Sequence, residues 1–280
     1  MSKSKLSYWK NHPGSAILRL LVWLSAIITV AVMAFLVGFI LIKGVGNLTP
    51  DLFALEYNSD NVSMLPSIIN TVYLTALTLL LAVPIGIFSA IYLAEYSRKN
   101  SFFVKIINIA NETLSGIPSI VYGLFGFLAF VISKKWGYSL LAGVITLAIM
   151  VLPLIIRTSQ EAMLGVDNTF REASYGLGAG KLRTVFKIVL PSAMPGILSG
   201  IILAIGRIVG ETAALIYTAG TVPEAATKLT SSSRTISVHL YCLLNEGLYT
   251  EQAYATAVVL IVFVVIINAL SNALAKKIMK

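Results

Sequence analysis

Six apolar segments, each long enough to cross a lipid bilayer as a helix, constrain this chain more than any other feature. A spanning helix needs about 20 apolar residues, because the hydrocarbon layer is about 30 Å thick. Inside that layer only helices and closed barrels satisfy their own backbone hydrogen bonds. We therefore expect an all-α polytopic membrane protein with six transmembrane helices. The expected spans are Leu20–Ile42, Ser67–Ala94, Thr113–Ser133, Trp136–Ile156, Ser192–Ala219 and Gln252–Ala275.

Charge and composition exclude several other classes. Charged residues make up only 12% of the chain, about half the share of a soluble domain. The net charge of +9 does not indicate nucleic-acid binding, because the basic residues flank the apolar segments. Cys242 is the single cysteine, and His12 and His239 have no ligand-like company, so we expect no disulfide, metal site or cofactor. A glycine-rich phosphate loop is missing, so we expect no ATP hydrolysis by this chain.

The distribution of lysine and arginine predicts the orientation, because basic residues accumulate in cytoplasmic loops. With the N-terminus inside, 15 basic residues lie in inner segments and five in outer segments, and Arg207 lies within a span. Because the number of spans is even, we expect both termini to be cytoplasmic. The membrane is expected to be the inner membrane of the cell. The inner residues are Lys3, Lys5, Lys10, Arg19, Arg98, Lys99, Lys105, Arg157, Arg171, Lys181, Arg183, Lys187, Lys276, Lys277 and Lys280.

The inner loop between the fourth and fifth spans, residues 157–191, has the most specific pattern. Its second half reads EASYGLGAGKLRTVFKIVLP. This pattern predicts a short amphipathic helix, a glycine-containing turn and a second helix stopped by Pro191. Ala173, Ser174 and Gly178 are small enough for close approach of a partner, and Phe186 and Ile188 would supply an apolar anchor. Such a surface needs a groove to bury it, or it lies on the bilayer.

The same loop resembles the signature loop of ABC importer permeases. The family pattern is Glu-Ala-Ala, three residues, Gly, nine residues, Ile, one residue, and Leu-Pro. This chain matches it from Glu172 to Pro191, with Ser174 in place of the second alanine. The resemblance implies that the loop is a coupling helix seated in a cleft of an ATPase subunit. The implied coupling residues are Glu172, Ala173, Ser174, Gly178, Phe186, Ile188, Leu190 and Pro191.

Arg207 and Glu211 are the charged residues of the fifth expected span. Four residues apart on one helix, they would lie on the same face, one turn from each other. One interpretation is a self-neutralising buried pair. The other is that the pair faces a water-filled path, where the guanidinium could bind an oxyanion through two parallel hydrogen bonds. Gly206 and Gly210 of the same span are expected to permit close helix packing.

The third expected span begins with a proline between serines and glycines. Pro118 removes an amide donor, and freed polar groups are tolerated in a membrane where they line a cavity. Ser115, Ser119 and Tyr122 are therefore candidate path residues. An ordinary proline kink is the alternative.

The segments SGIPSIVYGLFG and GRIVGETAAL resemble the phosphate-specific branch of these permeases. The resemblance implies the MetI-like fold and a substrate path that also includes Thr212. It further implies a second permease subunit as heterodimer partner, an ATP-binding subunit dimer and an extracytoplasmic phosphate-binding protein. The expected organisation is a cytoplasmic N-terminus (1–19), a first transmembrane helix (20–42), an outer loop (43–66) and a permease domain (67–280).

Three other readings remain open at this stage. One is the paralogous partner permease, or a permease for molybdate or sulfate. Another is a secondary transporter or channel, which would not need the loop from Glu172 to Pro191. An intramembrane enzyme would need a catalytic pair, and arginine cannot serve as a base at neutral pH.

Overall fold

A computed structural model describes residues 13–97 and 101–278 of the chain. The basic residues Lys3, Lys5, Lys10, Arg98, Lys99 and Lys280 of the orientation count lie outside this described part, as does His12. All regular elements of the described residues are helical. The long helices of this part are α2 (Pro13–Val45), α3 (Leu65–Ile91), α4 (Phe102–Gly116), α6 (Leu140–Leu164), α9 (Leu190–Val209) and α12 (Thr250–Ile278).

Shorter helical segments connect and extend the long helices. Three of them are π-helical turns that continue an α-helix: η2 (Tyr92–Tyr96), η3 (Phe127–Ser133) and η4 (Val185–Val189). The others are η1 (Pro50–Phe53), α5 (Ser119–Gly126), α7 (Asn168–Gly176), α8 (Lys181–Thr184), α10 (Ala213–Thr218) and α11 (Ile236–Glu246).

Five helical runs are long and apolar enough to cross a membrane: Ile17–Val45, Leu65–Tyr96, Leu140–Leu164, Lys181–Val209 and Thr250–Lys277. A sixth span requires α4 and the α5–η3 run to be counted together, and these are bent by 100° at the break between them. The structure therefore has the expected six spans only if this bent pair of helices is counted as one span. The bend is much sharper than an ordinary proline kink.

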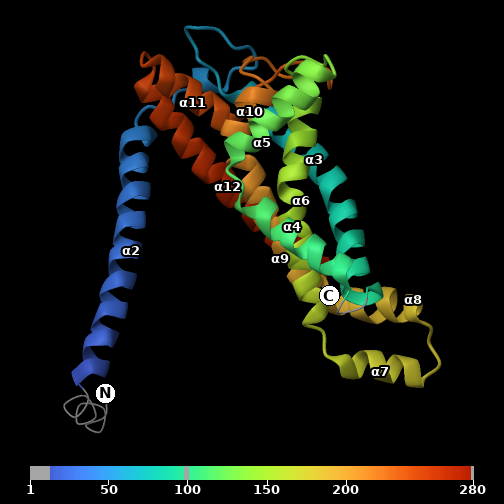
Figure 1. Cartoon of the computed structure of the whole chain (residues 1–280). Helices are drawn as coiled ribbons and strands as arrows, with labels where there is room; N and C mark the ends of the chain where they lie inside the picture. Colours follow the sequence, from blue (N-terminus) through green and yellow to red (C-terminus); the bar gives the residue numbers. More distant parts are fainter. Residues whose placement is uncertain (1–12, 98–100, 279–280) are drawn as a thin grey trace.

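Helix α6 forms the centre of the bundle. It packs between α3 and α9, and α5 and α10 cover its upper half in Figure 1. The buried side chains of this core include Leu147, Met150, Val151 and Ile155 from α6 and Leu215 from α10. A separate buried cluster lies near the α7 hairpin region and includes Met163, Val185 and Val189.

The first helix is separate from this core. Figure 1 shows α2 leaning away from the bundle and approaching α12 at one end. There Gly44 lies directly against the backbone carbonyl of Tyr254 and the side chain of Val258 on α12. Nearly all other apolar side chains of α2 are exposed, so this surface is available to lipid or to another subunit.

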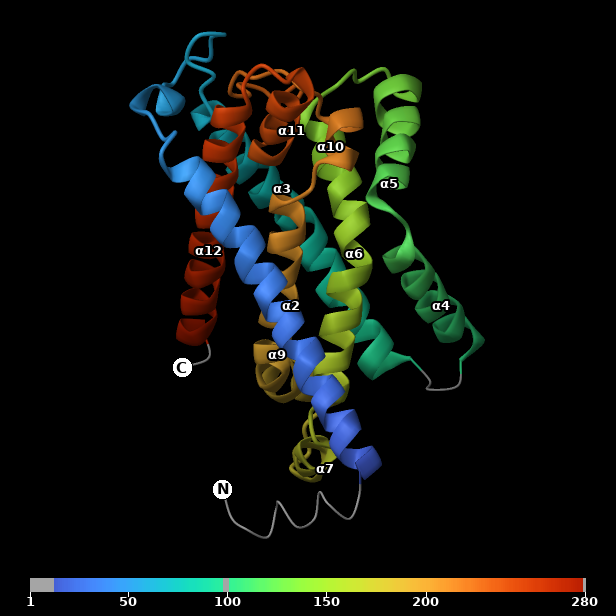
Figure 2. The same ribbon diagram turned by 90° about the vertical axis from the view of Figure 1, so that its left-hand side faces the viewer.

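The two ends of the bundle differ in what they carry. Helices α7 and α8 lie at one end, which we call the α7 end, and the start of α2 and the last turns of α12 also point there (Figures 1 and 2). The opposite end, the α11 end, holds α10, α11 and the loop from residue 46 to residue 64. The described ends of the chain therefore point toward the same end of the bundle as α7 and α8.

Two boundaries expected from the sequence are wrong. Pro191 does not stop the second loop helix, because α8, η4 and α9 form one helical run from Lys181 to Val209. Pro191 occupies the first turn of α9 after a π-helical turn, where its missing amide is tolerated. The fifth span does not extend as one helix to Ala219 either, because the helix ends at Val209.

Candidate functional site

A break between α9 and α10 places the two charged residues of this region in different surroundings. Arg207 lies half-buried in the last turn of α9, and Gly210 ends that helix. Glu211 is buried beyond the break, where its Oε1 accepts a hydrogen bond from the backbone N–H of Ala214 at 3.1 Å. Glu211 therefore caps the start of α10. The expected Arg207–Glu211 pair on one helix face is wrong, because these residues do not share a helix and form no ion pair within the described structure.

Contacts with α5 and α11 hold this break open. A Cβ atom on Gly123 of α5 would lie 2.8 Å from Cα of Ala214, so only glycine lets the two backbones approach this closely. On the other side, the Ser237 hydroxyl donates to the backbone carbonyl of Glu211 at 2.6 Å. Thr212, half-buried, has φ −124° and ψ −55° at the N-terminus of α10. The Ser237 hydroxyl therefore satisfies the Glu211 carbonyl, and the close approach of α5 supports the start of α10.

The second break, between α4 and α5, lies next to the first. Pro118 has no N–H to donate to the carbonyl of Leu114 four residues earlier. This carbonyl accepts from the Tyr122 hydroxyl at 2.8 Å and from the backbone N–H of Ile117 at 3.2 Å. Tyr122 is buried in the same apolar cluster as Ala204 and Ile208 in the last turns of α9, the part of that helix that carries Arg207. The structure thus brings Tyr122, Arg207 and the start of α10 together at two adjoining helix breaks.

The remaining expected path residues are less closely connected to this arrangement. The Ser115 hydroxyl donates to the carbonyl of Asn111 in its own helix, at 2.8 Å. Ser119 is half-buried at the start of α5. Their place beside Pro118 follows from the sequence, but their contacts do not join them to Arg207.

Helices α7 and α8 form a compact hairpin at the α7 end. Asp167 caps α7 by accepting from the backbone N–H and the hydroxyl of Thr169, both at 2.9 Å, and these hydrogen bonds lower the pKa of Asp167. Gly178 has φ +80°, a conformation that side chains disfavour. The buried hydroxyls of Ser174 and Thr184 lie 2.8 Å apart and join the two helices. Serine in place of the family's alanine therefore has a partner of its own.

Four of the expected coupling residues meet at a hollow of about 380 Å³ between the two arms of this hairpin. They are Ala173, Ser174, Gly178 and Ile188. Glu172 and Phe186 are exposed elsewhere on the hairpin, Leu190 packs on the core, and Pro191 is exposed at the start of α9. The sequence prediction did not include the other lining residues: Phe170, Leu177, Ala179 and Arg183.

Several large apolar side chains of the hairpin are exposed, and two of them, Phe170 and Leu177, line the hollow. Leu177 at the hairpin turn is 90% exposed, and Phe170, Tyr175 and Leu182 are also exposed. We call these four residues and Phe186 the hairpin patch. Several exposed large apolar side chains on one short segment are typical of protein interaction sites. A helical-wheel analysis of residues 168–186 could have identified it.

Within the described residues, no group of three or more histidine, cysteine, aspartate or glutamate side chains could hold a metal ion.

Comparison with known proteins agrees with this geometry. Residues 82–280 match the family model described as binding-protein-dependent transport system inner membrane component. A probable ABC transporter permease protein, YqgI, of Bacillus subtilis is 31% identical over 88% of this chain and 89% of its own length. The phosphate transport system permease protein PstA of Haemophilus influenzae is 34% identical over 76% of this chain and 75% of its own length.

Solved structures show the same fold at low sequence identity. A bacterial alginate ABC transporter in complex with a periplasmic protein that binds an alginate pentasaccharide has a TM-score of 0.71 at 16% identity, covering 97% of this chain and 98% of that chain. The MetNI methionine ABC transporter has a TM-score of 0.59 at 18% identity, covering 77% and 94%. The chain is thus a multi-pass membrane protein with the MetI-like fold of ABC importer permeases, and it belongs to the family of binding-protein-dependent transport system inner membrane components.

Proposed function

We propose that this chain is a permease subunit of an ATP-driven importer of inorganic phosphate. It forms half of the translocation path and couples to the ATPase through residues 172–191. Relatives named as phosphate transport permeases, with 34–36% identity over about 70–76% of this chain, support phosphate as the substrate. Its partners in this proposal are a second permease subunit, a dimer of ATP-binding subunits and an extracytoplasmic phosphate-binding protein.

The observation that carries this proposal is the state of Arg207. Arg207 lies in the last turn of α9, next to the helix break, and no carboxylate of the described residues is within ion-pair distance of it. An arginine within a membrane costs up to about 2.5–3.5 kcal/mol on insertion scales, the value for the centre of a spanning helix. An oxyanion in transit would offset part of this cost, since a guanidinium matches phosphate with two parallel hydrogen bonds. Tyr122 and Thr212 are the adjacent polar groups of the proposed path.

The hairpin patch supports coupling to an ATPase subunit. It lies at the end of the bundle toward which the described ends of the chain point (Figure 1). In the proposed topology this end is cytoplasmic, in the inner membrane, with the N-terminal segment 1–19 inside and the loop 43–66 outside. Residues 1–12 of that segment lie outside the described structure. The domain division at residue 67 is part of the same proposal.

Uptake by the reconstituted complex tests the function. We expect proteoliposomes containing the full complex and the binding protein to accumulate radiolabelled phosphate when ATP is present. Arg207→Gln should reduce uptake at least tenfold, and Arg207→Lys should reduce it less, because lysine keeps the charge but loses the planar geometry. Since Arg207 and Glu211 do not pair, adding Glu211→Gln to Arg207→Gln should not restore uptake.

The matched control is Arg157→Gln, which removes an arginine that is 53% exposed and pairs with Glu161 on α6. Its uptake should stay within twofold of wild type at equal abundance of the complex. Normal uptake by Arg207→Gln would show that Arg207 is not a path residue. A wild-type complex that hydrolyses ATP without accumulating phosphate would refute the substrate assignment.

A further inference from the structure

A buried ion pair fastens the hairpin to the end of α3. Glu95 lies in η2, the π-helical continuation of α3, and Arg171 lies in α7, 76 residues later. The Arg171 Nη2 and Nε atoms lie 2.7 Å and 3.1 Å from Oε1 of Glu95. The Arg171 side chain is only 13% exposed and the Glu95 side chain only 6%. The pair therefore lies between the elements rather than on the surface.

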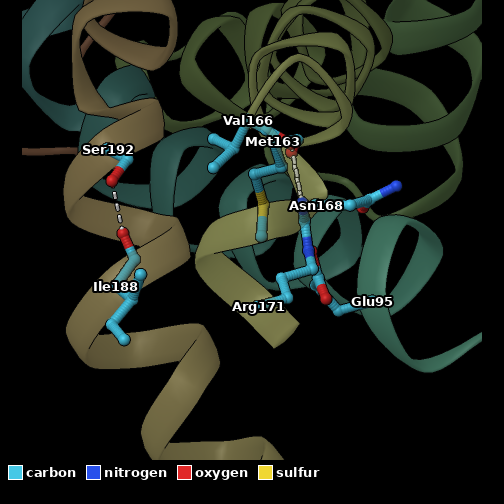
Figure 3. Close-up of polar contacts among 7 residues, drawn as sticks. All are labelled: Glu95, Met163, Val166, Asn168, Arg171, Ile188 and Ser192. Atoms are coloured by element: carbon cyan, nitrogen blue, oxygen red, sulfur yellow. Dashed lines mark hydrogen bonds and ion pairs between the residues drawn. The ribbon is translucent and has the colours of Figure 1, made fainter. Parts of the chain in front are cut away.

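Arg171 also binds the connection between α6 and α7. Its Nη2 donates to the carbonyl of Met163 at 2.8 Å and its Nη1 to the carbonyl of Val166 at 2.7 Å, as the close-up in Figure 3 shows. A weaker contact of 3.3 Å reaches the Asn168 side chain. One planar guanidinium thus joins three separate segments: η2, the end of α6 and α7 itself. A lysine ammonium is a compact charge that cannot reproduce this fixed fork.

A second contact beside the first holds the other arm of the hairpin. Tyr96 follows Glu95 directly, and the ammonium of Lys181 in α8 lies 4.8 Å from the centre of its ring. Beneath both contacts, Ile91 packs with Met163, Val185 and Val189 in a buried apolar cluster. Adjacent residues of η2 therefore contact α7 and α8, so the hairpin cannot shift relative to α3 without breaking one of them.

We infer that Glu95 and Arg171 are positioning residues that transmit movement of the hairpin to α3. This inference rests on the proposed function, in which the hairpin docks on the ATPase. Displacement of the hairpin would either separate a buried ion pair, which is unfavourable, or carry η2 along. Helix α3 packs along α6 in the core, so its displacement reaches the helices that form the breaks around Arg207. A π-helical turn is frequent at functional sites and gives this end of α3 a geometry distinct from the rest.

The first test measures how much phosphate enters per ATP hydrolysed by the reconstituted complex. Arg171→Lys keeps the charge opposite Glu95 but cannot bind the carbonyls of Met163 and Val166 at the same time. We expect it to retain at least half of the ATP hydrolysis while the phosphate-to-ATP ratio falls at least threefold. Arg171→Met should lower the ratio at least tenfold. The control Arg157→Gln breaks an exposed pair within a single helix and should leave the ratio within 1.5-fold.

The second test does not depend on the substrate. Spin labels are placed at Gly176, the exposed last residue of α7 with open space for a side chain, and at Phe88, an exposed residue of α3, in a Cys242→Ser background. Pulsed electron paramagnetic resonance should give one narrow distance distribution in the wild-type complex and in Arg157→Gln. The distribution should broaden at least twofold in Arg171→Lys and in Glu95→Gln. Glu95→Gln also removes the ion pair, so it replaces Arg171→Met if that variant does not assemble.

The outcomes separate this inference from the proposed function. An unchanged ratio together with an unchanged distance distribution in Arg171→Lys would overturn the positioning role. Hydrolysis without phosphate uptake by the wild type would instead refute the phosphate assignment, and the distance measurement would still decide whether the pair holds the hairpin to α3.

Discussion

Two arginines at opposite ends of the molecule are largely buried, but their surroundings differ. At the α7 end, Arg171 donates to a carboxylate, two backbone carbonyls and an amide oxygen. At the α11 end, Arg234 is 4% exposed, and its Nε and Nη2 atoms meet no acceptor. Its guanidinium instead lies 4.7 Å from the centre of the Tyr57 ring.

The surroundings of Arg234 explain how the α11 end is stabilised. The Asn70 side chain on α3 donates to the carbonyls of Glu224 and Arg234 and accepts from the N–H of Ala226. His239 is fully buried, with its ring at 89° to that of Tyr57. These contacts of the α11 end are side-chain hydrogen bonds to the main chain and ring packing. The α7 end relies on the ion pair and the hydrogen bonds of Arg171. These contacts are directional, as the inferred transmission of movement from the hairpin to α3 requires.

The largest expected effect is on stability after loss of the network at the α7 end. Arg171→Met leaves the Glu95 carboxylate buried and unpaired, which costs about 3–5 kcal/mol in comparable cases. Chemical unfolding of the purified chain in detergent, followed by tryptophan fluorescence, would measure this loss. The double variant with Glu95→Gln should recover part of it, because no buried charge remains. Equal stability of Arg171→Met and wild type would contradict the contrast between the two ends.

An intermediate effect is expected from acidification of the α11 end. Burial, and secondarily the nearby charge of Arg234, lowers the pKa of His239 from 6.5 to about 3. The unfolded chain therefore binds a proton below pH 6.5 that the folded chain does not. The free energy of unfolding therefore has its full value, as far as His239 is concerned, above pH 6.5. It decreases by about 1.4 kcal/mol per pH unit as the pH falls from 6.5 toward 3.

This pH effect can be measured with one variant. Between pH 7.5 and pH 5.0, His239 should lower the free energy of unfolding of the wild type by about 2 kcal/mol. His239→Phe keeps a ring against Tyr57 but has no such titrating group, so its free energy of unfolding should fall by about 2 kcal/mol less over the same pH range. The same pH dependence in both proteins would mean that other groups cause it.

The smallest expected effect is that of Arg234→Met. The change removes a cation–π contact worth about 0.5–2 kcal/mol, but it also removes a buried charge that lacks acceptors at two of its nitrogens. These contributions oppose each other, so we expect a change in unfolding free energy of less than about 1 kcal/mol in either direction. The same detergent unfolding assay applies. A loss as large as that of Arg171→Met would show that Arg234 has partners of equal strength.

The sequence by itself determined the class of fold and the position of the hairpin. Long uncharged runs must form helices in a bilayer because no other backbone arrangement there satisfies its hydrogen bonds. The pattern from Glu172 to Pro191 identified the family, which the comparisons confirmed. Both properties depend on local composition and spacing, and so they could be predicted without knowledge of neighbouring helices.

Only the tertiary structure decided where helices break and which charges meet. The end of α9 at Val209 depends on Gly123, which admits α10, and on Ser237, which binds the carbonyl of Glu211. Likewise, Glu95 meets Arg171 across 76 residues through the packing of α3 against α6. Helical periodicity assigned Arg207 and Glu211 to one face, but periodicity holds only within an unbroken helix. Contacts between distant segments set that limit, and local spacing does not encode them.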